Sequence, residues 1–124
     1  MKEILAVIRI NMMNKTKVAL TNAGVHSFTA TGRVVGRGKG LVDYDLLQAA
    51  SSGQSEAVAQ LGDGPRLMPK RIITVVVPDK QVPVAVDAII ATNQTGNPGD
   101  GKIFILPVDE AYRVRTGEHG DKSL

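Results

Sequence analysis

Residues 72–93, IITVVVPDKQVPVAVDAIIATN, contain a strand and a helix in direct succession. Residues 72–77 are all β-branched, which is typical of a buried strand. Pro78 ends this strand, and Asp79 is expected to cap a helix over 80–93. Pro83 is tolerated in the first turn of that helix. The helical spacing predicts one buried stripe, formed by Val82, Val86, Ile89, Ile90 and Asn93.

A second strand and helix open the chain. The apolar run 4–10 predicts a strand, and 11–24 predicts a helix that Asn14 caps and Gly24 ends. Further strands are expected over 28–35, where Gly32 permits a bend, over 102–108, and over a short stretch at 111–115. The order β-α-β-β-α-β predicts a ferredoxin-like α+β fold, in which two helices cover one face of a four-stranded antiparallel sheet.

The predicted sheet is apolar on both faces. In the first strand Ile4, Ala6, Ile8 and Ile10 alternate with Leu5 and Val7, and in the last strand Ile103 and Ile105 alternate with Phe104 and Leu106. Two helices cover only one face, so we expect another subunit of a homo-oligomer to cover the other. The alternative is that a long loop of the same chain folds back over the sheet.

The composition indicates one cytoplasmic domain spanning 1–124. Hydrophobic residues make up 43% and charged residues 22% of the 124 residues. The absence of cysteine excludes a disulfide scaffold, a thiolate metal site and a thiol nucleophile. No segment has the length of a membrane span or the pattern of a signal peptide. The net charge of +3 is too small to argue by itself for nucleic-acid binding.

The segment 41–69 is long for a connection between two strands. We expect it to be mobile alone and ordered on a partner, the alternative being an inert insertion. A polar tail is expected over 117–124.

Two glycine clusters flank the strands, GRGKG at 36–40 and TGNPGDGK at 95–102. Glycine lets backbone N–H groups approach an anion closely, and each cluster also contains a cation. Arg113 and Arg115, two apart in an extended stretch, are expected to point to the same side. Together they predict a polyphosphate site, although neither cluster matches a Walker A or Rossmann motif and each also fits a plain loop.

No catalytic constellation is evident, so an enzyme is not expected. His26 and His119 are far apart and more consistent with solvent contact or local hydrogen bonds. No set of residues predicts a tight metal site, and any Mg²⁺ would come with nucleotide phosphates.

Several motifs resemble the PII nitrogen-regulatory proteins. They are KEILAVIR at 2–9, FTA at 28–30, GRGKG at 36–40, VVPD at 76–79, QTGNPGDGKIF at 94–104 and RVRTGE at 113–118. The resemblance covers nearly the whole chain except 41–69. NQTGNP at 93–98, PKR at 69–71 and the enlarged loop are most similar to the nitrogenase-associated branch, and within it to the second of two sister proteins.

The resemblance implies a trimer with ATP or ADP in the clefts between subunits. It also implies that the segment 41–69 is the T-loop, which docks into target proteins. The implied nucleotide ligands from one subunit are Gly36, Arg37, Gly99, Asp100, Gly101 and Lys102, with Val76 near the base. Thr29, Arg113 and Arg115 would come from the neighbouring subunit.

Family members also bind 2-oxoglutarate beside MgATP. Lys70, Lys39 and Gly40 match the residues that contact it. Gly38 stands where the family usually has a glutamine that coordinates magnesium, so the usual 2-oxoglutarate geometry is left open. A sister subunit in a mixed assembly is the alternative carrier of that response. Tyr44 is not assigned the family's tyrosine modification.

Three functions are compatible with these patterns. The first is a signal-transducing regulator that binds dinitrogenase and blocks docking of its reductase. The second is a PII-like regulator of an ammonium transporter or a biosynthetic enzyme. The third is a small nucleotide-using enzyme on the same fold, which the lack of a placed nucleophile or general base disfavours. Neither nucleic acid nor membrane insertion is expected.

Overall fold

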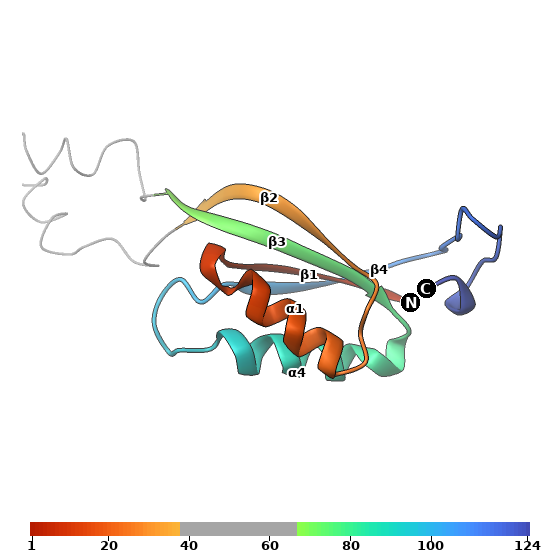
Figure 1. Ribbon diagram of the computed structural model, residues 1–124, viewed down its shortest axis with the longest axis horizontal. Helices are drawn as coiled ribbons and strands as arrows, with labels where there is room; N and C mark the ends of the chain where they lie inside the picture. Colours follow the sequence, from red (N-terminus) through yellow and green to blue (C-terminus); the bar gives the residue numbers. More distant parts are fainter. Residues whose placement is uncertain (38–66) are drawn as a thin grey trace, which may run out of the picture.

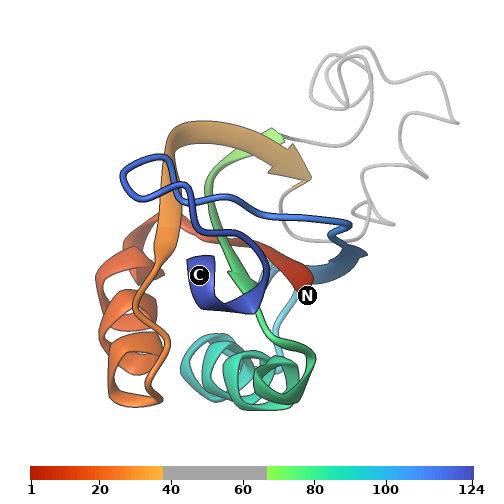
Figure 2. The same ribbon diagram turned by 90° about the vertical axis from the view of Figure 1, so that its right-hand side faces the viewer.

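The computed structural model describes residues 1–37 and 67–124 and shows a four-stranded sheet with two helices on one face (Figures 1 and 2). Neighbouring strands are antiparallel, in the order β2-β3-β1-β4. This arrangement confirms the predicted ferredoxin-like fold. Its strands and α-helices are β1 (Lys2–Arg9), α1 (Met13–Asn22), β2 (Phe28–Arg37), β3 (Leu67–Val77), α4 (Val82–Asn93) and β4 (Lys102–Pro107).

The hydrophobic core lies between the sheet and the two helices. Along β1 every second side chain is buried, as the alternation predicted, because only one face of the strand meets the helices. The helices are also joined by a buried hydrogen bond, in which Asn93 Nδ2 donates to Thr16 Oγ1 at 3.0 Å. The buried apolar residues are Ile4, Ala6, Ile8, Met13, Leu20, Val25, Ile73, Val75, Val77, Ala85 and Ile89.

Both predicted N-caps are wrong. A 3-10 turn precedes each helix, Ile10–Met12 before α1 and Asp79–Gln81 before α4, and neither α-helix has a side-chain cap hydrogen bond. The turn before α1 moves its start to Met13, so that Asn14 lies inside the first helical turn. Asp79 pairs instead with the α-amino group of Met1 at 3.0 Å.

The end of α1 follows the prediction. Gly24 has φ +85° and its N–H donates to the Thr21 carbonyl at 3.0 Å. The next N–H, that of Val25, donates to the Leu20 carbonyl at 2.9 Å. These two bonds form a Schellman motif, which a glycine at this position permits without strain.

Other predicted boundaries need correction. β1 ends at Arg9, so Ile10 lies in the 3-10 turn and is 43% exposed. In α4, Ile90 is on the outer side at 43% exposure, and Ala85 joins Ile89 and Asn93 in the buried stripe. These side chains follow the 3.6-residue repeat, whereas Ile90 is rotated about 100° from Ile89.

The strands beyond the core also differ from the prediction. β3 begins at Leu67 rather than at 72, because residues 67–70 continue the ladder with β2. No strand forms over 111–115 in the described part of the chain, where Tyr112 and His119 make only an isolated bridge. In the same part, no helix is long and apolar enough to cross a membrane.

The second face of the sheet carries apolar side chains without a covering layer among residues 1–37 and 67–124. Cross-strand register places Thr29, Thr74, Leu5 and Phe104 in one row on this face. Phe104 is 50% exposed. The alternative cover, the predicted loop 41–69, lies mostly outside the described residues. We call this surface the open face.

Candidate functional site

The loop between α4 and β4 is organised by one carboxylate. Asp100 accepts hydrogen bonds from the backbone N–H of Thr95 at 2.7 Å, from that of Gly96 at 3.0 Å, and from the Thr95 hydroxyl. Arg9, the last residue of β1, donates to the same carboxylate and to the Pro98 carbonyl at 3.1 Å. The loop is therefore closed on itself and fastened to the sheet.

These bonds hold the pKa of Asp100 far below its usual range, chiefly because the Thr95 hydroxyl and N–H stabilise the charged form. Asp100 was predicted from its motif as a nucleotide ligand. Its carboxylate is engaged with its own loop, so the contribution that the structure supports is to fix the backbone of the neighbouring glycines.

The glycines of this loop let it approach β1 closely. Gly101 has φ +118°, and a Cβ there would lie 2.0 Å from the Val7 carbonyl oxygen. Gly99 has φ +97°, and a Cβ there would lie 3.5 Å from Arg9 Nη2 and 3.6 Å from Lys70 Nζ. Glycine at position 101 therefore allows the close approach to β1, and glycine at position 99 leaves room beside Arg9 and Lys70.

Lys70 joins the two glycine clusters. Its side chain is buried, with the residue 5% exposed, and Nζ donates to the Gly99 carbonyl at 2.7 Å. A Cβ on Gly36, at the end of β2, would lie 3.3 Å from Lys70 Cγ. Gly36 and Gly99 thus meet around one lysine, with Arg9 beside it. Gly38, Lys39 and Gly40 lie outside the described residues.

The pKa of Lys70 lies below its ordinary value of 10.5, first because burial penalises the charged amine and then because Arg9 repels it. Between the lowered pKa and 10.5 the unfolded chain holds this proton while the folded chain does not. Stability therefore rises with pH across that window.

A Lys70→Met variant tests this linkage. We expect the free energy of unfolding of the wild-type protein, relative to Lys70→Met, to increase as the pH rises from the lowered pKa of Lys70 towards 10.5. Urea titrations at several pH values measure the difference. A difference that stays constant or decreases over this range would show that the lysine remains charged in the folded state.

Arg9 was missed as a site residue. The sequence contained a signal, since a charged residue closes an otherwise apolar strand. Register places Arg9 directly opposite Lys70, and the α4–β4 loop supplies the carboxylate that pairs with it. This partner is 91 residues away in sequence, so the pairing depends on the topology.

Three other predicted residues lie on the open face. Lys102 is opposite Val7 at the start of β4, Val76 is opposite Glu3, and Thr29 is opposite Thr74. Thr29 and Lys102 are exposed. The open face therefore continues from the glycine loop along the sheet.

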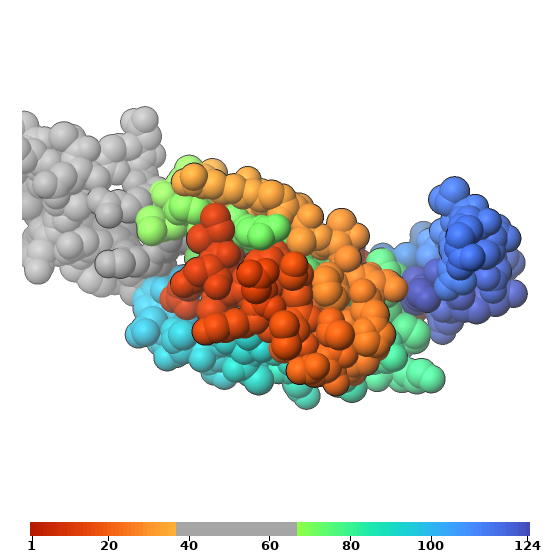
Figure 3. All heavy atoms as spheres, in the orientation of Figure 1, coloured from red at the N-terminus to blue at the C-terminus, as the bar shows by residue number. Residues whose placement is uncertain are grey.

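Arg113 and Arg115 are not brought to this loop within one chain. They belong to the C-terminal segment 108–124, which lies beyond the opposite end of the sheet from the α4–β4 loop (Figures 1 and 3). Arg113 donates to Glu118 at 3.2 Å and to the carbonyl oxygen of Lys122 at 3.2 Å. Arg115 is exposed. A site that combines the α4–β4 loop with Arg113 and Arg115 therefore needs these arginines from a second subunit.

The fold and this pair of glycine loops identify the class of protein. Residues 1–118 match the family model described as nitrogen regulatory protein P-II. The chain therefore belongs to the P-II family.

Individual relatives indicate which branch of the P-II family the chain resembles. The chain is 44% identical to the "nitrogen fixation nifHD region GlnB-like protein 2" of Methanothermobacter marburgensis, over 100% of both chains. It is 40% identical to the protein of the same name from Methanobacterium ivanovii, over 100% of this chain and 99% of that one. It is also 42% identical to "nitrogen regulatory protein P-II 2" of Methanothermobacter thermautotrophicus, over 100% and 97%. These matches confirm the resemblance to the nitrogenase-associated branch.

Proposed function

We propose that this P-II protein is a signal-transducing regulator that binds ATP or ADP in clefts between the subunits of a homotrimer. The observation that carries the proposal is the separation of the two halves of the predicted site. The loop fastened by Arg9 and Asp100 lies at one end of the sheet, and the segment bearing Arg113 and Arg115 lies at the other. Assembly through the open face brings unlike ends of two subunits together, which is what a shared phosphate site requires.

The residues present suit a polyphosphate. Lys70 and Arg9 supply positive charge beside Gly99, where no side chain blocks close approach of an anion. Lys102 adds a third cation on the open face. A bound nucleotide would bring any Mg²⁺ with it. Binding of 2-oxoglutarate through Lys70, Lys39 and Gly40 is a secondary proposal, because Gly38 has no side chain to coordinate magnesium.

We further propose that the nucleotide state controls a target through the T-loop, and that the target is dinitrogenase. The names of the relatives place those proteins in a nitrogen-fixation gene region, which supports this choice. Docking there would block nitrogenase reductase. A ligand shifts the loop only through its different affinities for the two loop states. A mixed assembly with a sister protein is the alternative to the homotrimer.

Calorimetry of ATP and ADP binding tests the shared site. Arg113→Ala and Arg115→Ala are each expected to weaken binding by about 1–3 kcal/mol, because each removes a charged hydrogen bond to phosphate. Glu118→Gln is the matched control for Arg113, since it removes the partner in the tail and keeps the guanidinium. Unchanged affinity in both arginine variants would contradict the assignment.

Two alternatives remain to be separated by experiment. A pull-down with dinitrogenase, with and without ATP and 2-oxoglutarate, tests the proposed target. Capture of an ammonium transporter alone would instead favour a PII-like regulator of that transporter. Rapid ATP turnover that is lost in Lys102→Ala would favour a nucleotide-using enzyme. P-II proteins are regulators, and we expect no such turnover.

A further inference from the structure

Charge is segregated among the elements of this fold. The elements α1, β2 and β3 contain no aspartate or glutamate, and they carry six cations, Lys15, Lys17, Arg33, Arg37, Lys70 and Arg71. Within residues 1–37 and 67–124 no carboxylate forms an ion pair with Lys17, Arg33 or Arg71. Lys70 belongs to the open face, so the cations near β2 on the helix side of the sheet are Lys17, Arg33 and Arg71.

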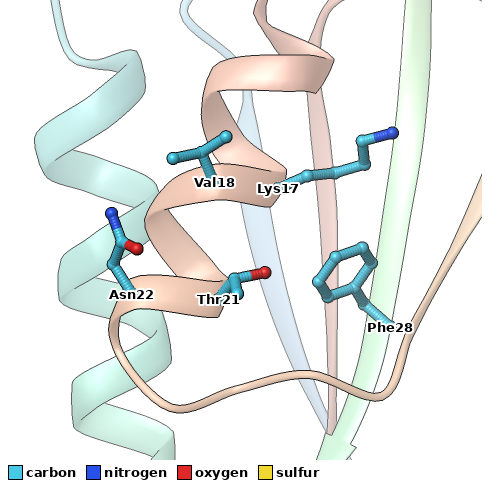
Figure 4. A pocket seen from close by; sticks show the side chains of 5 residues that line it. All are labelled: Lys17, Val18, Thr21, Asn22 and Phe28. Atoms are coloured by element: carbon cyan, nitrogen blue, oxygen red, sulfur yellow. The ribbon is translucent and has the colours of Figure 1, made fainter.

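A shallow groove lies beside these cations, between α1 and the start of β2 (Figure 4). Its volume is about 320 Å³, and it is lined by Lys17, Val18, Thr21, Asn22 and Phe28. Val18 is 59% exposed, and Phe28 is half-buried against the core. Figure 4 shows Lys17 and the Phe28 ring on the same side of α1. The groove thus combines an apolar wall with one cation at its rim.

A β-bulge in β2 brings Arg33 to the same face. Phe28 pairs with Val75, which is buried on the helix side, and after the register shift Arg33 pairs with Arg71. Without the extra residue Gly32 would occupy that position, because a strand alternates between faces. Like charges directly opposite on a sheet disfavour pairing, so an external anion would relieve this pair.

The bulge also fixes how Arg71 is oriented. Its Nε and Nη2 donate to the Thr31 carbonyl in the bulge, at 3.1 and 2.9 Å. Arg33 is exposed. The partners of Phe28 and Arg33 are four residues apart on β3, which corresponds to about 13 Å. An extended peptide covers that distance in about four residues.

We propose that the α1–β2 surface, in which the groove lined by Lys17, Val18 and Phe28 continues to Arg33 and Arg71 at the bulge, docks an extended acidic segment of a partner protein. An apolar side chain of the segment packs on Val18 and Phe28, and a carboxylate four positions along binds Arg33. Charge complementarity and the apolar wall together favour a protein, since single-stranded nucleic acid would use several exposed aromatic rings and this groove has one. The surface is on the helix side of the sheet, opposite the open face that carries the proposed nucleotide cleft.

Fluorescence anisotropy with a labelled nonapeptide, Gly-Asp-Leu-Thr-Ser-Thr-Glu-Glu-Gly, tests the proposal on the full-length protein. Its first glutamate follows the leucine by four positions. Lys17→Glu and Arg33→Glu are each expected to weaken binding about tenfold, because each replaces an attraction by a repulsion. Lys15→Glu, on the same helix but outside the groove, is the matched control with little effect. Replacing the peptide's leucine by serine should also weaken binding about tenfold.

Changes in amide chemical shifts show where the peptide binds, which a general effect of net charge on affinity cannot show. The peptide is expected to change the amide chemical shifts of Val18, Thr21 and Phe28. If Arg33→Glu unfolds the protein, Arg33→Gln takes its place in the binding test. Absence of peptide binding, or equal weakening by Lys15→Glu, overturns the proposal. Tighter binding of a single-stranded oligonucleotide or of phosphatidylserine vesicles, dependent on Arg33, would assign the groove to nucleic acid or membrane and also overturn it.

Discussion

Replacing Gly101 by alanine is expected to lower the free energy of unfolding by about 3 kcal/mol. Gly101 has φ +118°, a conformation that costs a residue with a side chain about 1–3 kcal/mol. A Cβ would also lie 2.0 Å from the Val7 carbonyl oxygen, and overpacking of this kind costs about 1–3 kcal/mol more. The smaller entropy of the unfolded alanine chain offsets about 0.4–1 kcal/mol of this loss.

The control lies five residues away in the same loop. Gly96 also has a positive φ, +84°, but no atom lies within 4 Å of the position of its Cβ. Gly96→Ala is therefore expected to lose only about 1 kcal/mol, from backbone strain alone. Urea denaturation at one protein concentration compares the two variants, since assembly makes apparent stability depend on concentration. Equal losses would show that the loop moves away from β1 at little cost.

The Gly101 contact also explains the position of the site. Because the loop passes against the backbone of β1, Asp100 is carried to the end of that strand, where it meets Arg9. Loss of the close approach between Gly101 and β1 is expected to disturb the α4–β4 loop before it disturbs the core. The core consists of side chains on the helix side of the sheet. Fold stability and site geometry are therefore coupled through one glycine.

The sequence predicts what depends on local patterns. The β-branched run 72–77 and the helical repeat of 82–93 determine their elements almost alone, and Gly24 ends α1 as its conformational freedom suggests. The two failed caps have a different origin. Asn14 and Asp79 are suitable cap residues, but each helix is entered through a 3-10 turn, which shifts the first helical residue away from them.

The candidate site also combines features that are evident in the local sequence with features that depend on the fold. The glycine clusters were evident from their composition, whereas their meeting at Lys70 depends on antiparallel register between β2, β3 and β1. The sequence marked Arg9 only as a charged residue at the end of an apolar strand, and its role depends on Asp100, a carboxylate that follows α4. The bulge that turns Arg33 to the helix side was suggested only by Gly32, and its effect on charge required the register.

Deletion of residues 44–64 is expected to abolish binding to the target while leaving the trimer and nucleotide affinity intact. The ladder between β2 and β3 extends to the pair Arg37 and Leu67, so the deletion removes no described strand residue. The remaining residues 38–43 and 65–66 are enough to connect the two strands, because hairpin loops commonly need only 2–5 residues. None of the site residues placed by the structure falls within 44–64.

Three measurements on the same deletion variant separate a docking loop from a structural one. Sedimentation should give three subunits per assembly, with the mass reduced by the deleted residues, calorimetry should give wild-type nucleotide affinity, and a dinitrogenase pull-down should capture nothing. Lys122→Glu provides a matched control, since it changes the exposed C-terminal segment and should retain capture. Dissociation of the trimer in the deletion variant would mean that the loop is structural and is needed for assembly. In that outcome the long loop completes the fold, and target recognition must come from another surface.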